Sequence, residues 1–290
     1  MNGKIVPRRP YRDDIELSTI GFGGIVVVNE SQDEADAVVR EAIDRGVNYF
    51  DVAPTYGNGE AEEKLGIALE GRRDDVFVAC KTTQRKADDA RRELEGSLAH
   101  LKTDHFDLYQ FHAVSTMEDV QTILGPGGAA ELFLDAKREG KVRYLGFSAH
   151  SVEAAIALMD RAEFTIDSIL FPFNMTCWAQ GDFGPQVLEH ARRKGIARLA
   201  LKALAHHRRP KGQEKKWNKC WYVPVDEREL AEQALRFTLT QDVTAAIPPG
   251  EKELFRLAVD IAADFEPMPA DEQQRVLAAT DGLEPIFARK

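Results

Sequence analysis

The sequence has few cysteines, no long apolar run and no excess of positive charge, and each absence narrows the functions open to it. Its three cysteines, Cys80, Cys177 and Cys220, stand apart, with neither the CxxC spacing of a redox or metal motif nor the even number of a disulfide framework. This pattern predicts a reducing, cytoplasmic environment. No run of about 18 apolar residues occurs, and no apolar segment follows the charged N-terminus. We therefore expect neither a membrane span nor a secretion signal.

The charge balance argues against nucleic acid and anionic membranes as partners. The 290 residues carry a formal net charge of −10, whereas either partner would require a basic surface. An anionic cofactor would need a local basic patch instead. With 43% hydrophobic residues the chain can bury a full core, and no low-complexity linker divides it. We expect one domain over residues 1–290.

Apolar strand-like runs alternate with amphipathic helical segments along the chain. Ser31 and Glu34 have the spacing of a capping box before a helix over 35–45, and Gly46 ends that helix. Counting GFGG as the first, we find eight strand-like segments whose ends lie mostly about 30 residues apart, the length of a βαβ unit. The predicted fold is therefore an α/β, (β/α)8 TIM barrel. A hairpin over 4–17 precedes it, to plug the barrel floor, and an extra C-terminal helix follows.

Four polar side chains stand at or just beyond the ends of three consecutive predicted strands. Asp51 ends one strand and Tyr56 follows it in the loop of DVAPTYGNGE, while Lys81 and His112 end the next two. The carboxyl ends of parallel strands meet at one mouth of a barrel, so the four side chains are expected to converge there. Each residue alone has an ordinary structural explanation, such as a turn cap or a solvated strand end. Together they form a candidate catalytic site that requires no metal.

The order and local contexts of these four residues resemble the aldo-keto reductases, in a bacterial-type form with divergent cofactor-binding segments. The resemblance also covers ELSTIGFGG, GKVRYLGFS and TAAIPPG. It implies a cytoplasmic oxidoreductase that reduces an aldehyde or ketone, or oxidises the alcohol, with hydride from NADP or NAD. Tyr56 would be the general acid/base, with a phenolate favoured by the Lys81 ammonium and Asp51 holding that lysine. His112 would contact the substrate carbonyl.

The resemblance also assigns residues to the nicotinamide dinucleotide. The implied cofactor-binding positions are Gly23, Gly24, Asp51, Ser148, Asn174, Lys202, Gly250 and Lys252. Several neighbours depart from the family pattern: Leu170 stands for a glutamine, Leu201 for a stacking tyrosine, and Pro249-Gly250 for a Lys-Ser pair of NADP-dependent members. These departures leave the choice between NADP and NAD open.

The one long irregular insertion, over 205–225, follows the seventh predicted strand and opens on the same mouth. Its aromatics Trp217 and Trp221 are candidate substrate-binding residues, with a small carbonyl compound or alcohol as the expected partner. Two other functions stay open at this point. One is a non-catalytic, cofactor-binding regulatory subunit similar to the potassium-channel β subunits of the family, and the other is a Schiff-base lyase that uses Lys202.

Overall fold

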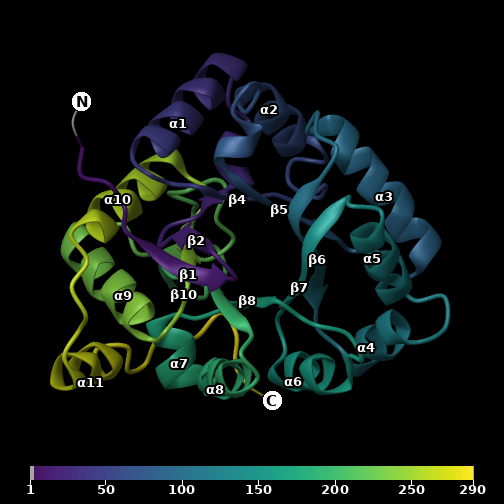
Figure 1. Ribbon diagram of the computed structural model, residues 1–290. Coiled ribbons are helices and arrows are strands. Elements are labelled where there is room, and N and C mark those ends of the chain that lie inside the picture. Colours follow the sequence, from purple (N-terminus) through teal and green to yellow (C-terminus); the bar gives the residue numbers. More distant parts are fainter. Residues whose placement is uncertain (1–2, 290) are drawn as a thin grey trace.

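Eight parallel strands form a barrel in the computed structural model, which describes residues 3–289 (Figure 1). Within that range the hydrogen-bonded order is β12-β9-β8-β7-β6-β5-β4-β3, and a parallel bridge between Ile20 and Ala246 joins the two ends. The barrel strands are β3 (Phe22–Gly23), β4 (Tyr49–Asp51), β5 (Phe77–Thr82), β6 (Phe106–Val114), β7 (Val142–Ala149), β8 (Ser168–Pro172), β9 (Ala197–Leu201) and β12 (Ala245–Ile247). The predicted (β/α)8 fold class is confirmed.

Helices surround the barrel and alternate with its strands, as the apolar periodicity predicts. They are α1 (Gln32–Asp44), α2 (Glu60–Ala68), α3 (Ala87–His100), α4 (Met117–Leu124), α5 (Ala129–Arg138), α6 (Val152–Arg161), α7 (Met175–Gly181), α8 (Pro185–Arg193), α9 (Arg228–Thr240), α10 (Lys252–Ala263) and α11 (Ala270–Ala278). Short 3-10 turns span Gly24–Val27 and Arg73–Asp75. The sequence analysis did not anticipate α4 and α7, which are only two turns long. No helix of the described chain is long and apolar enough to cross a membrane.

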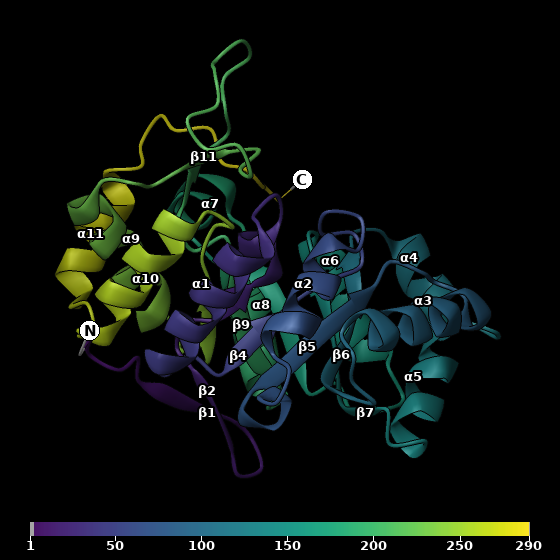
Figure 2. The same cartoon turned by 90° about the horizontal axis from the view of Figure 1, so that it is seen from above.

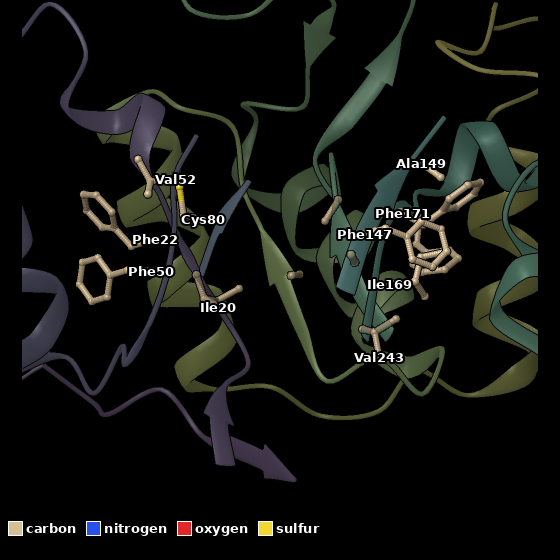
Figure 3. Packing of buried hydrophobic residues seen from close by; sticks show 14 of the residues in the cluster. Ile20, Phe22, Phe50, Val52, Cys80, Phe147, Ala149, Ile169, Phe171 and Val243 are labelled. Atoms are coloured by element: carbon tan, nitrogen blue, oxygen red, sulfur yellow. The ribbon is translucent and has the colours of Figure 1, made fainter. Parts of the chain in front are cut away.

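The side chains of the barrel strands divide between two apolar cores, because successive residues of a strand face opposite sides. The outward set packs beneath the helices, where Phe22 and Phe50 stack with ring centroids 5.0 Å apart (Figure 3). Phe255 of α10 meets Phe22 edge-on. Cys80 belongs to this outer layer, and its thiol points to buried Glu62 of α2. The inward set leaves room for polar groups only at the strand ends.

The N-terminal hairpin and the long insertion lie at opposite ends of the barrel (Figure 2). The hairpin consists of β1 (Arg8–Arg12) and β2 (Ile15–Ser18). Its Tyr11 packs among interior side chains, 5.1 Å from the ring of Phe77, and its hydroxyl donates to Ser168 Oγ at 3.0 Å. Tyr11 therefore closes the floor, as expected. At the other end β10 (Ala205–His207) and β11 (Val223–Pro224) pair and bring the two ends of the insertion together.

Candidate active site

The four residues at the strand ends line one cavity of about 180 Å³. Asp51 ends β4, Lys81 lies near the end of β5, His112 lies near the end of β6, and Tyr56 comes from the loop between β4 and α2. The parallel register places these strand ends next to each other, with Asp51 opposite Ala79 and Lys81 opposite Gln110. The structure thus brings together all four residues that the sequence nominated.

A buried ion pair forms the base of this cavity. Lys81 Nζ donates to Asp51 Oδ1, to the carbonyl oxygen of Val52 at 3.1 Å and to the hydroxyl of Tyr56 at 3.2 Å. Burial lowers the pKa of Lys81, but the Asp51 carboxylate and the Tyr56 hydroxyl raise it by more, so its net pKa is raised. Lys81 is therefore an ammonium at neutral pH, with one of its donors directed at the phenol.

Two residues that the sequence analysis missed hold the other oxygen of the carboxylate. The hydroxyl of Tyr49 and the amide nitrogen of Gln110 each donate to Asp51 Oδ2 at 3.2 Å. Tyr49 precedes Asp51 by two positions, and Gln110 precedes His112 by two, so strand alternation could have found both. They keep Asp51 oriented towards Lys81.

Burial and the Lys81 ammonium act in opposite directions on the Tyr56 hydroxyl. Burial raises the pKa of Tyr56, and the Lys81 ammonium lowers it by less, so the net pKa lies above its usual value. The Lys81 ammonium also lies 4.9 Å from the centre of the tyrosine ring. Tyr56 is thus a protonated phenol at neutral pH, hydrogen-bonded to a fixed cation.

His112 lines the cavity next to an irregularity in β6. The register of β6 on β7 shifts between Phe111 and Val114, and Ala113 has a φ of +55°. Arg85 stabilises the bulge by donating to the carbonyl oxygen of His112 at 2.8 Å. The imidazole meets the Tyr56 ring edge-on, with centroids 6.0 Å apart. Burial, followed by the charge of Lys81, lowers the pKa of His112 to about 2, so the ring is neutral.

The remaining nominated residues occupy different positions. Ser148, Lys202, Trp221 and Gly250 also line the cavity, together with apolar Leu170, Leu201 and Ile247. Gly23, Gly24, Asn174, Lys252 and Trp217 are not among its lining residues. The Asn174 side chain accepts the backbone N–H of Cys177 at the start of α7, and the Trp217 indole donates to Asp226 at 2.5 Å. Trp221 is thus the tryptophan of the insertion that reaches the candidate site.

Comparison with known proteins agrees with this arrangement. A sequence profile described as "Aldo/keto reductase family" matches residues 19–253, which includes the whole barrel. The chain belongs to the aldo/keto reductase family. Among curated relatives, the uncharacterized oxidoreductase YqkF of Bacillus subtilis is 29% identical over 195 residues, and the aldo-keto reductase YhdN of the same organism is 31% identical over 202. These matches cover 63% and 66% of the chain, and span only 61% and 58% of the relatives' lengths.

Solved structures of aldo-keto reductases share the fold. A holo form from Bacillus halodurans superposes with a TM-score of 0.75 at 23% identity, covering 98% of this chain and 100% of that one. A Klebsiella pneumoniae enzyme described in complex with NADPH has a TM-score of 0.71 at 20% identity, covering 97% and 96%. At such identities the likeness establishes the barrel, and the chemistry must be argued from the residues of this chain.

Two features of this aldo-keto reductase fit a nicotinamide dinucleotide. The Ser148 hydroxyl accepts the backbone N–H of Ala113 at 2.8 Å, which leaves its own proton free for an acceptor in the cavity. The first turn of α10, directly after Gly250, has no side-chain cap, so its backbone N–H groups are available to a phosphate. The neighbouring Lys252 is already paired with Glu30 at 2.5 Å and with Glu34 at 3.2 Å. The site therefore fits the group with few free cations around the phosphate position.

Proposed function

We propose that this chain is a nicotinamide-dependent oxidoreductase that reduces an aldehyde or ketone, with Tyr56 as the proton donor. The observation that carries the proposal is the hydrogen bond between the Lys81 ammonium and the Tyr56 hydroxyl, beside His112 in one cavity. Reduction of a carbonyl requires a hydride at carbon and a proton at oxygen. A phenol fixed by a buried cation is suited to the second task.

The residues of the chain divide this chemistry among themselves. Tyr56 gives its proton to the carbonyl oxygen, and Lys81 stabilises the phenolate that remains. Asp51 keeps Lys81 charged and in place. Neutral His112 has a ring nitrogen, Nδ1, without a partner in the described chain, and its ring presents a hydrogen-bonding edge to the substrate oxygen. When bound, the dinucleotide supplies the hydride.

We assign the dinucleotide to the opposite wall and rim of the same cavity. Ser148 and Asn174 would hold the nicotinamide amide, with Asp51 beneath the ring. Gly250 and the start of α10 would receive a phosphate together with Lys252, and Gly23 and Gly24 would leave room for the backbone to approach. Trp221 would meet the substrate, with Trp217 supporting the loop behind it.

Native mass spectrometry of the purified chain, followed by turnover of a carbonyl panel with NADH and NADPH, tests the proposal. We expect bound dinucleotide and oxidation of the reduced cofactor at 340 nm, a wavelength at which only the reduced nicotinamide absorbs. Bound dinucleotide without turnover of any carbonyl would favour the non-catalytic regulatory subunit. Absence of dinucleotide would remove the reductase function altogether.

Tyr56→Phe is the matching variant, because it removes the transferable proton and keeps the ring. We expect kcat to fall by about 10²-fold or more, with the dissociation constant of the cofactor nearly unchanged. Stopped-flow turnover and fluorescence titration of the cofactor measure the two quantities. Unchanged kcat would exclude Tyr56 as the proton donor.

A further inference from the structure

Lys202 occupies a backbone conformation that a residue with a side chain seldom adopts. It directly follows β9, and its φ of +61° lies in the left-handed region. A turn fixes this conformation, since the N–H of Ala205 donates to the carbonyl oxygen of Lys202 at 2.9 Å. The conformation directs the side chain into the cavity that Tyr56 and His112 also line. Outliers of this kind are commonly retained at binding sites, where the position of the side chain matters.

The ammonium of Lys202 has no acidic partner among residues 3–289. It donates no hydrogen bond and forms no salt bridge there, and its neighbours are the rings of Trp221 and Phe287, at 5.9 and 6.0 Å from Nζ. Burial, reinforced by the charge of Lys81, lowers the pKa of Lys202 to about 8, although Cys177 and Cys220 raise it. Lys202 is half-buried, and a charge that is partly removed from water without a partner is costly, so a bound anion would reduce that cost.

No other residue that lines the cavity offers a free negative charge to the Lys202 ammonium. Asp51 is the one acid in the lining, and Lys81 neutralises it. The third lysine of the lining, Lys219, is paired with Glu30 at 2.8 Å. His112 and His150 are neutral because burial lowers their pKa values to about 2 and about 3. One positive charge therefore remains for a ligand.

An aromatic wall surrounds the same lysine on the side of the insertion. Phe287, near the C-terminus, stacks on His150 with centroids 4.9 Å apart and meets Trp221 edge-on at 5.9 Å. Trp221 is 48% exposed, so the wall lies at the entrance. With a volume of about 180 Å³, the cavity is small beside the pockets that hold drug-sized ligands. A short ligand with one anionic end fits this combination of volume, cation and apolar wall.

We propose that Lys202 binds a carboxylate of the substrate, and that this reductase acts on short-chain aldehydes or ketones that carry an acid group. The inference rests on the reductase function proposed above and specifies its substrate class. Lys202 is preferred for the substrate over the cofactor phosphates because it shares a wall with His112, whereas the uncapped start of α10 already offers a phosphate site. The carboxylate replaces the acidic partner that residues 3–289 do not provide.

The test compares succinic semialdehyde with its methyl ester, which have the same aldehyde and differ in the charge. For the wild type we expect kcat/KM for the acid to exceed that for the ester by at least tenfold, mainly through KM. Lys202→Met should bring the ratio close to one, whereas Lys202→Arg should keep it above one. Lys219→Met is the matched control: it removes a cavity lysine that already has an acidic partner, and the ratio should stay as in the wild type.

A binding measurement keeps the inference testable without turnover. Butyrate should change the fluorescence of Trp221 in the wild type with a dissociation constant at least tenfold below that of methyl butyrate, and Lys202→Met should abolish this difference. Equal affinities, or equal kcat/KM for acid and ester, would overturn the carboxylate site while leaving the reductase function intact.

The carboxylate site would also be overturned if Lys202→Met weakened cofactor binding and lowered both rates equally, because Lys202 would then serve the cofactor phosphates. Covalent trapping of the semialdehyde on Lys202 by borohydride would instead make it a nucleophile. Failure to turn over any carbonyl would count against the reductase function itself.

Discussion

Lys81 and Lys202 line the same cavity, and their neighbours shift their pKa values in opposite directions. Lys81 contacts Asp51 and the Tyr56 hydroxyl, which together outweigh its burial and raise its pKa. Lys202 is surrounded by aromatic rings, and burial lowers its pKa to about 8. Both residues are lysines, so the difference between their pKa values arises from the neighbours that the fold places around each side chain.

Lys81→Met should shift the pH dependence of carbonyl reduction to higher pH. Lys81 lowers the pKa of Tyr56 against the larger, opposite effect of burial, so its loss raises the phenol pKa further. Reduction requires the protonated phenol. The alkaline limb of the rate profile should therefore move to higher pH, while the maximal rate falls. A profile of kcat against pH measures both.

The control for that variant is Asp51→Asn combined with Lys81→Met. The single change leaves the Asp51 carboxylate buried without its cation, which destabilises the protein. The double variant removes both charges, so it should recover stability but not the wild-type profile. Because the Asp51 carboxylate raises the pKa of Tyr56, its loss should reverse part of the alkaline shift; an unshifted profile in Lys81→Met alone would contradict the coupling of Lys81 to Tyr56.

Neutral His112 should make the fold less stable as the pH falls below about 6.5. The unfolded chain takes up a proton on this imidazole near pH 6.5, whereas in the folded chain burial and then Lys81 lower its pKa to about 2. Between these values the unfolded state binds more protons, so the free energy of unfolding decreases with decreasing pH. His112→Asn should therefore lose about 2 kcal/mol less than the wild type between pH 7 and pH 5. Urea unfolding at the two pH values measures it, and equal losses would contradict the prediction.

At the scale of elements, α1 shows how closely local sequence specifies a helix start. Ser31 Oγ accepts the N–H of Glu34 at 3.3 Å, and Glu34 Oε2 accepts the N–H of Ser31 at 3.0 Å, which is the capping box that the sequence predicts. Ser31→Ala should reduce the free energy of unfolding by about 1 kcal/mol, measured by denaturant titration. Ser31→Thr should restore most of that loss, and no difference between the two variants would mean that the cap is not limiting.

The bulge in β6 is the element that local sequence could not predict. FDLYQFHAV reads as a regular strand, and strand alternation places Gln110 and His112 on one face. The left-handed Ala113 and the Arg85 contact with His112 depend on a neighbouring loop that lies 27 residues away in sequence. The exact approach of His112 to Tyr56 thus needs the tertiary structure.

At the scale of the whole molecule, acidic residues form salt bridges with the basic groups nearest the proposed phosphate position of the cofactor. Glu30 joins Lys219 of the insertion to Lys252 of α10, at 2.8 and 2.5 Å, and Arg256 pairs with Glu41 of α1 at 2.8 Å. These pairs, in a chain of net charge −10, leave little positive potential for an extra phosphate.

We therefore expect weak discrimination between NADPH and NADH. The ratio of their dissociation constants, measured by fluorescence titration at one ionic strength, should stay below about 10³, or roughly 4 kcal/mol. Glu30→Gln should increase the preference for NADPH, because it frees Lys219 and Lys252 from their shared carboxylate. A larger wild-type preference would indicate a further phosphate-binding residue elsewhere in the chain.

The sequence by itself determined the barrel and the nomination of four catalytic candidates. Strand and helix periodicities are local properties, and the carboxyl ends of parallel strands must meet at one mouth, so Asp51, Tyr56, Lys81 and His112 were expected together. Only the tertiary structure decided how their charges are balanced. The burial of Tyr56 and the lack of an acidic neighbour for Lys202 within residues 3–289 depend on segments that are distant in the chain. Because desolvation and Coulomb interactions depend on distance in space, periodicity along the chain cannot reveal them.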